Sequence, residues 1–324
     1  MTGRQGPFRR REGGWDNYWR RAERTSAFGS KSGEHPAIAA FWRSFFSEVR
    51  TDVRSPLGID LASGSGAVLD AAAASYEALP DFLCIDLSQQ ALEGVKSRHP
   101  SVDVLLADAS NVPLADSCCD IVTSQFGIEY AGRRSIAEMA RLVRPGGHCG
   151  AILHHRGGVV FENSTRNLEA TRRLVDSRFL PQAKRLLEAG FAALSGGARL
   201  PYEAAAQDFQ SAVTAVEAIL DELGTDVADS LLTRLYGDIA NLHENLQSYR
   251  AREVMRWIDD MQTEVESYAA RTEAMLEAAI DADDFSRISA VLKAKGLRLR
   301  VAEPLIDPDR DLPLAWSVHG LSVA

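Results

Sequence analysis

The chain has 324 residues, of which 45% are hydrophobic and 25% are charged, an ordinary globular balance with enough chain for a sizeable core. No apolar run approaches the roughly 18 residues that a membrane span needs, and no apolar stretch follows the N-terminal arginines. We therefore expect neither a membrane-spanning segment nor a signal peptide.

The net charge of −9 is concentrated in residues 156–295, which carry 16 basic and 23 acidic side chains. This acidic stretch argues against a broad nucleic-acid footprint, and only residues 1–24 are basic. Four cysteines fit neither metal-ligand spacing nor a disulfide framework; they are Cys84, Cys118, Cys119 and Cys149. We expect reduced thiols, no metal, no nucleic-acid partner and a cytoplasmic location.

Short apolar runs alternate with helical stretches from residue 57 to residue 155. Strands are predicted at 57–61, 82–87, 102–106, 119–124 and 148–154, and helices at 67–78, 89–98 and 135–143. Ser88 is the predicted N-cap of the second helix, and 144–147 (Arg-Pro-Gly-Gly) is a predicted tight turn. Strands and helices that alternate at this spacing indicate right-handed βαβ units and a parallel sheet.

Almost everything from about 160 to 295 has a helical pattern. Apolar residues recur at steps of three and four over 227–246 and again over 254–275, which is typical of helix-on-helix packing. These stripes form either an antiparallel hairpin within one chain or the seam of a homodimer. A helix at 285–295 and strands at 297–303 and 314–321 follow, so the helical block is predicted to be an insertion in an α/β domain.

Three acidic residues follow or end successive predicted strands. Asp60 begins the turn Asp60-Leu-Ala-Ser-Gly-Ser-Gly66, where glycines let the backbone approach a ligand and a helix N-terminus offers free amides. Asp86 ends the second strand and is placed to accept both hydroxyls of a ribose, while Asp108 follows the third and is placed to accept from an adenine amine. Each alone is equally well a cap or loop residue, but together they indicate a ligand crevice.

In these motifs the chain resembles the class I S-adenosylmethionine (SAM)-dependent methyltransferases. IDLASGSG resembles the glycine-rich first motif with Ala62 in place of a common glycine, and CIDLS, ADAS, DIVTSQFGIEYA and EMARLVRPGGHCGAILHH resemble the segments that follow. The resemblance covers about 50–155 and 285–324. It implies a Rossmann-like, seven-stranded, mostly parallel sheet with helices on both faces, ended by an antiparallel hairpin, with the helical insertion between strands five and six.

The resemblance implies a set of residues that bind SAM and its product S-adenosylhomocysteine. The methionine end is assigned to Asp60, Ala62, Ser63 and Gly64, the ribose to Asp86 and Leu87, the adenine to Asp108 and Ala109, and the remaining wall to Gln125 and Phe126. Tyr18, in the segment Trp15–Trp19, is a candidate for the carboxylate or the sulfonium, which aromatic faces suit. Trp15 and Trp19 are equally well explained by packing on the sheet.

A general base is needed only if the methyl acceptor holds its proton at neutral pH. The candidates after strand four are Glu129 and Tyr130, and those after strand five are His154, His155 and Arg156. One of the two histidines is expected to be structural.

We predict an N-terminal tail with cofactor-capping helices (1–50), a SAM-binding core (51–158), a helical insertion that is a substrate lid or dimer arm (159–282) and a C-terminal part of the core (283–324). The predicted activity is in-line transfer of the methyl group of SAM to a small-molecule acceptor, neutral or cationic. The alternatives are transfer of another SAM-derived group, such as aminopropyl, and a non-catalytic SAM-binding protein.

Overall fold

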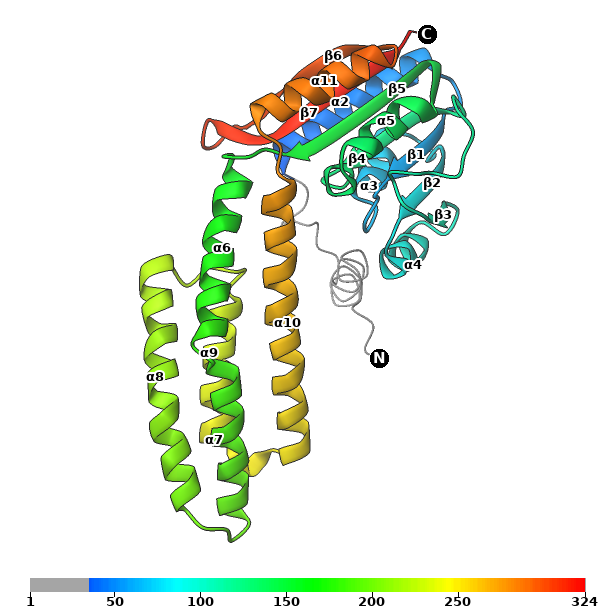
Figure 1. Cartoon of the computed structure of the whole chain (residues 1–324). Coiled ribbons are helices and arrows are strands. Elements are labelled where there is room, and N and C mark those ends of the chain that lie inside the picture. Colours follow the sequence, from blue (N-terminus) through cyan, green and yellow to red (C-terminus); the bar gives the residue numbers. More distant parts are fainter. Residues whose placement is uncertain (1–34, 324) are drawn as a thin grey trace, which may run out of the picture. The chain divides into compact units, whose positions relative to one another are not determined.

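The computed structural model describes residues 35–323, so Trp15, Tyr18 and Trp19 lie outside the described residues. The described chain forms two compact units, one made of 35–162 with 274–323 and the other of 163–273 (Figure 1). No helix within 35–323 combines the length and the apolar character that crossing a membrane requires.

The first unit contains a seven-stranded sheet in the order β3-β2-β1-β4-β5-β7-β6. Its strands are β1 (Leu57–Leu61), β2 (Asp81–Asp86), β3 (Asp103–Leu106), β4 (Cys119–Gln125), β5 (Val143–His154), β6 (Leu297–Asp307) and β7 (Leu312–Ser322). The first five strands pair in parallel, and β7 is antiparallel to both β5 and β6. This confirms the predicted sheet, its C-terminal hairpin and the helical insertion after strand five.

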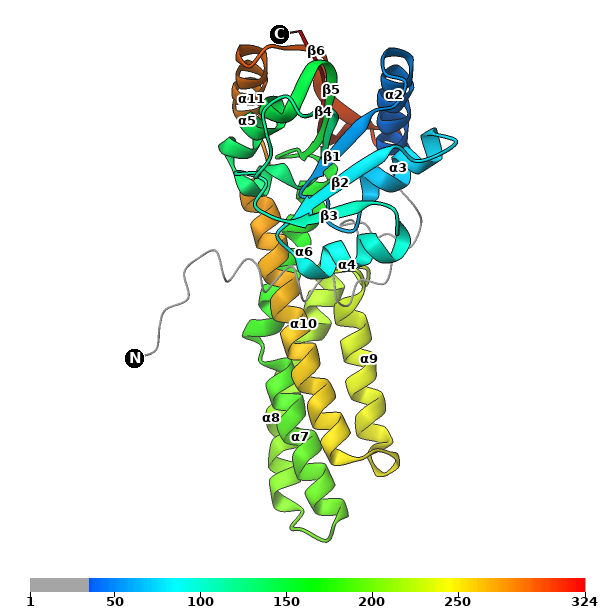
Figure 2. The same cartoon turned by 90° about the vertical axis from the view of Figure 1, so that its right-hand side faces the viewer.

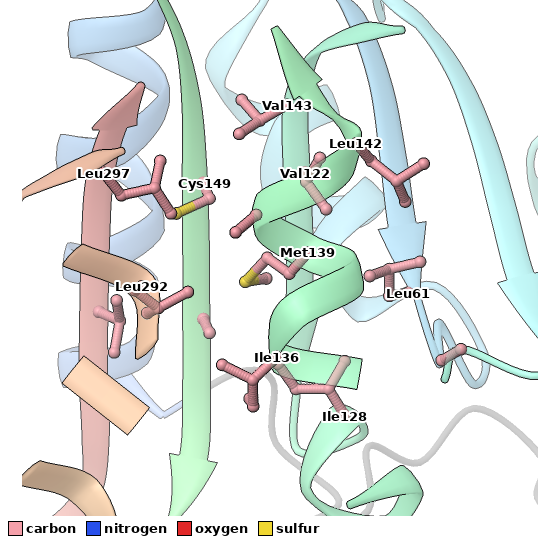
Figure 3. Close-up of a cluster of buried hydrophobic side chains, with 14 of the residues drawn as sticks. Leu61, Val122, Ile128, Ile136, Met139, Leu142, Val143, Cys149, Leu292 and Leu297 are labelled. Carbon is pink, nitrogen blue, oxygen red and sulfur yellow. The ribbon is translucent and has the colours of Figure 1, made fainter. Parts of the chain in front are cut away.

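Helices cover both faces of the sheet (Figure 2). The buried side chains of one face come from α2 (Pro36–Asp52), α3 (Ala67–Ser75) and α4 (Gln89–Arg98). Those of the other face come from α5 (Arg133–Leu142) and α11 (Ala282–Ala294), whose Met139 and Leu292 are shown in Figure 3. Ser88 caps α4 as predicted, since its hydroxyl accepts from the Ala91 amide at 3.2 Å.

Residues 36–50 fall in the predicted N-terminal segment, whereas the structure packs α2 (Pro36–Asp52) against the sheet. Trp42, Phe45 and Phe46 are almost fully buried there. A Cβ at Gly150 of β5 would lie 2.8 Å from the Phe45 ring, so glycine at this position lets the helix approach the strand. The helix α2 therefore forms part of the layer that covers one face of the sheet.

The predicted turn 144–147 does not separate two elements, because β5 runs unbroken from Val143 to His154. The register jumps there, since Cys119 pairs with Val143 whereas Ile121 pairs with His148. The extra residues of β5 form a bulge, in which Gly146 adopts φ +80°. The Pro-Gly-Gly pattern thus marks an irregular strand rather than its boundary.

The second unit is helical. Its helices are α7 (Phe179–Leu194), α8 (Leu200–Leu223), α9 (Leu231–Glu244), and the parts of α6 (Val159–Asp176) and α10 (Ala251–Ala278) that lie within 163–273. Both predicted stripes contribute to one buried cluster, with Val227 and Leu235 from the first and Val254 and Val265 from the second. The stripes therefore pack within one chain, and a homodimer stays a prediction.

A buried histidine pair joins β5 to β7 and is expected to make the fold acid-sensitive. The Nδ1 atom of His148 lies 3.0 Å from the Nε2 atom of His319; Asp52 is 3.2 Å from His148, Glu48 is 3.8 Å from His319, and Arg300 pairs with both carboxylates. Burial lowers the pKa of His148 and lowers the pKa of His319 to about 4, although the two carboxylates oppose this effect.

Because both folded-state pKa values lie below the ordinary histidine value, the unfolded chain binds more protons in mild acid. Stability is therefore fully present above about pH 6.5 and is lost as the pH falls toward 4, by about 1–3 kcal/mol for His319. Urea unfolding from pH 7.5 to pH 4.5 measures this loss. His319→Gln should flatten the slope, and an unchanged slope in that variant would contradict the assignment.

Candidate functional site

The turn between β1 and α3 has the left-handed backbone that the glycine-rich motif requires. Ala62, Gly64 and Gly66 have φ values of +50°, +51° and +85°. The Ser63 amide donates to the Ile85 carbonyl at 3.1 Å, which ties the turn to β2. Ala62 is thus a non-glycine residue in a conformation that disfavours a side chain.

Asp86 at the end of β2 holds the turn in place. Its Oδ2 atom accepts from the Gly64 amide at 2.8 Å, and its Oδ1 atom accepts from the Ser88 amide at 2.8 Å. Each carboxylate oxygen has a second lone pair that a ligand hydroxyl can use. The next side chain, Leu87, is 50% exposed, so it offers an apolar surface beside the carboxylate.

Asp60 at the end of β1 is only 1% exposed and is incompletely hydrogen-bonded. Its Oδ1 atom accepts from the Thr123 hydroxyl at 2.8 Å, whereas its Oδ2 atom and the nearby Ser63 hydroxyl have no hydrogen-bond partner among the described residues. Burial raises the pKa of Asp60 to about 7; the Thr123 hydrogen bond opposes this rise and the charge of Asp86 adds to it. A buried, unpartnered carboxylate oxygen suits a ligand that brings a cationic N–H donor.

Asp108 lies two residues beyond the end of β3 rather than at its last residue. Its Oδ1 atom accepts from the Ser110 amide at 2.7 Å, the local turn contact that was the alternative explanation for this residue. Ala109, beside it, is buried. A contact of Asp108 and Ala109 with adenine therefore stays a prediction.

The segment after β4 packs directly on the glycine-rich turn. A Cβ placed on Gly127 would lie 2.6 Å from the Ala62 carbonyl oxygen and 2.7 Å from the Ala62 Cβ. Phe126 adopts φ +51° and its amide donates to the Ile152 carbonyl at 2.8 Å. The Gln125 side chain accepts from the Trp42 indole N–H, so it links β4 to α2.

Glu129 and His154 form a buried pair. The Glu129 Oε1 atom accepts from the backbone amide of His154 at 3.1 Å and lies 2.7 Å from the Nδ1 atom of its ring. The second oxygen of Glu129, Oε2, has no hydrogen-bond partner among the described residues. The His154 ring lies 4.5 Å from the Phe126 ring and 5.8 Å, edge to face, from the Tyr130 ring.

The other two candidates after β5 have packing roles. The His155 ring stacks on Trp316 at 4.3 Å, and Trp316 stacks in turn on Phe285 at 4.1 Å. The Arg156 guanidinium donates to the Ala279 carbonyl at 3.3 Å. The stacking of His155 is consistent with the expectation that at least one of the two histidines is structural, which stays a prediction.

Sequence reasoning did not find two residues that shape this site, Thr123 and Gly127. Thr123 lies opposite Asp60 in the β1–β4 register, and the sequence indicates it only by a hydroxyl residue two positions before the end of β4. Gly127 is indicated only by the presence of a glycine shortly after β4.

Residues 59–151 match a family model described as a methyltransferase domain. Over 108 residues the chain is 32% identical to the demethylmenaquinone methyltransferase of Renibacterium salmoninarum, covering 33% of this chain and 44% of that protein. Over 102 residues it is 31% identical to the malonyl-[acyl-carrier protein] O-methyltransferase of Pectobacterium atrosepticum, covering 31% and 40%. The chain thus spans less than half the length of these relatives.

Among solved structures, DesVI of Streptomyces venezuelae is similar, with 21% identity, a TM-score of 0.31, and coverage of 36% of this chain and 51% of that one.

Proposed function

We propose that residues 59–151, which match a methyltransferase domain, form a class I SAM-dependent methyltransferase domain, and that the protein transfers the methyl group of SAM to a small-molecule acceptor. The observation that carries the proposal is the buried Asp60 carboxylate, whose Oδ2 atom has no partner among the described residues, beside a turn held by Asp86. A cofactor with an ammonium group and a ribose satisfies both carboxylates.

In this proposal the chain binds and orients SAM and the acceptor and keeps water out of the site. SAM itself brings an already activated methyl group. Asp60 takes the ammonium, Asp86 the ribose hydroxyls, and Asp108 with Ala109 the adenine. The left-handed turn at Ala62–Gly66 lets the backbone amides of the turn approach the ligand. Alignment of the acceptor with the S–CH3 bond then supplies most of the rate acceleration.

The acceptor is proposed to be a small molecule, in keeping with the name of the demethylmenaquinone methyltransferase to which the chain is similar. The acidic helical insertion is proposed to select it, because like charges disfavour a polyanion such as a nucleic acid. A role of the insertion as a dimer arm is a further proposal that light scattering tests.

Binding of S-adenosylhomocysteine, which keeps the ammonium group, is expected to tighten as the pH rises from 5.5 to 7.5. Burial raises the pKa of Asp60 to about 7 in the ligand-free protein. Below that pH the ligand ammonium must therefore displace a proton from the Asp60 carboxyl group. The affinity should rise by up to about tenfold per pH unit below that pKa and then level off. Calorimetry at four pH values measures the slope.

Asp60→Asn should bind more weakly at pH 7.5 and show a much smaller slope, while Asp81→Asn, at the exposed start of β2, should behave as the native protein. Equal slopes in the native protein and Asp60→Asn would remove Asp60 from the ammonium site. Absence of any binding would overturn the proposed function itself.

A further inference from the structure

Glu129 and His154 come from different segments and meet in the interior. Glu129 lies in η1 (Ile128–Ala131) after β4, and His154 is the last residue of β5. The Glu129 side chain is fully buried and that of His154 is 4% exposed. Phe126, in the segment assigned to the cofactor wall, packs against the same imidazole. A titratable pair that is buried beside the glycine-rich turn is costly to keep unless its charges are matched.

With Glu129 ionised, the contacts favour a proton on the Nδ1 atom of His154. The Oε1 atom of Glu129 receives the backbone N–H of His154, so it acts as an acceptor, and it lies 2.7 Å from Nδ1. A carboxylate has no proton to give, so Nδ1 donates to it and the basic lone pair of the neutral ring is on Nε2.

The pair places an imidazole beside a buried acidic side chain. The Oε2 atom of Glu129 has no hydrogen-bond partner among the described residues. A ring that takes up a proton on Nε2 during the reaction would face the Glu129 carboxylate across the 2.7 Å contact. The pair is thus arranged as a base and not only as a brace between β5 and η1.

We propose that His154 is the general base of the reaction, that Glu129 is its positioning residue, and that the acceptor is an aromatic or enolic hydroxyl. This rests on the proposed function. The hydroxyl proton passes to Nε2, an oxygen lone pair forms the O–CH3 bond, and the S–CH3 bond breaks with its electron pair left on sulfur. The imidazolium then loses its proton to solvent.

The hydroxyl class follows from the same charges. A carboxylate acceptor carries no proton at neutral pH and does not use a base. A protonated amine would add a cation beside the sulfonium and beside the imidazolium that forms. A neutral hydroxyl avoids both problems, and Phe126 and Tyr130 place aromatic rings next to the His154 imidazole.

The first test needs no acceptor. Nitrogen NMR of the full chain, with labelled histidines and saturating S-adenosylhomocysteine, should show a signal of the Nδ1–H tautomer that disappears in His154→Gln and persists in His155→Gln. An Nε2–H tautomer for His154 would overturn the proposal.

The second test uses SAM with a labelled methyl group and umbelliferone, with its amino and carboxyl analogues as matched acceptors. Umbelliferone should be methylated on oxygen. His154→Gln should lower kcat about a hundredfold with little change in KM, and Glu129→Gln should shift the acid limb of the pH profile. His99→Gln, where the native ring pairs with Asp70 on the surface, should leave turnover unchanged.

The outcomes separate the two proposals. Failure to bind SAM would reject the proposed function. Protein that binds SAM but methylates only the amino or carboxyl analogue, or does not methylate umbelliferone, would reject the hydroxyl class. If His154→Gln and Glu129→Gln each lose kcat only in proportion to their loss of thermal stability, the pair has a structural role alone.

Discussion

Asp86→Ala is expected to weaken the binding of SAM and S-adenosylhomocysteine by at least about a hundredfold. The change removes a charged acceptor for two ribose hydroxyls, each worth about 1.5–3 kcal/mol at most. It also frees the Gly64 amide, which donates to Asp86 at 2.8 Å and fixes the glycine-rich turn. Isothermal calorimetry on the purified variant measures the loss directly.

The matched control is Asp103→Ala, because Asp103 lies at the exposed start of β3 and not at a strand end that faces the turn. It should bind both ligands as the native protein does. Asp86→Asn should fall between the native protein and Asp86→Ala, since an amide oxygen replaces one carboxylate acceptor. Native affinity in Asp86→Ala would move the ribose to another part of the sheet edge.

Gly127→Ala is expected to abolish detectable SAM binding while the protein remains folded. The added Cβ would lie 2.6 Å from the Ala62 carbonyl oxygen and 2.7 Å from the Ala62 Cβ, and neither belongs to a flexible side chain. The turn that cradles the ligand must therefore shift. Overpacking of this kind costs about 1–3 kcal/mol of stability, which thermal unfolding measures.

Gly94→Ala provides the comparison for Gly127→Ala. Gly94 lies inside α4, and nothing stands within 4 Å of a Cβ placed there. Alanine in a helix interior should stabilise the protein by about 0.5–1 kcal/mol and leave ligand binding unchanged. Full SAM binding by Gly127→Ala would mean that the turn is not part of the ligand site.

The sequence predicted the sheet because each strand is short, apolar and followed by its own helix. The alternation from Leu57 to His154 leaves few other arrangements, and the two-strand hairpin after residue 296 repeats the same local pattern. The pattern failed at Pro145–Gly147, where tertiary pairing carries a strand through residues that favour a turn. The position of α2 was missed because its aromatic residues carry no signal of which face they cover.

The candidate site was predictable only where the chemistry is local to one strand end. Asp60 and Asp86 were found because they stand at the ends of successive strands, and the structure joins Asp86 to the turn after β1. The pairing of Glu129 with His154 was not predictable, since 25 residues separate them and only the β4–β5 register brings them together. The Oδ2 atom of Asp60 has no hydrogen-bond partner among the described residues, and the pKa of the Asp60 carboxyl group is raised. Both properties depend on burial, which no single sequence position reveals.

The bridge between His155 and Ile280 has a consequence for how the chain folds. The antiparallel pairing of His154 with Ala315 joins positions separated by the whole helical unit, and closing so long a loop costs chain entropy. Within that unit, Asn167 bonds Tyr268 at 3.1 Å and Arg172 bonds Glu273 at 2.5 Å, so its entry and exit helices are held together. Once these helices pair, the loop between His154 and Ala315 shrinks from the whole of 154–315 to the segments 154–172 and 273–315. The paired helices thereby lower the entropic cost of completing the sheet, whatever the length of the insertion beyond them.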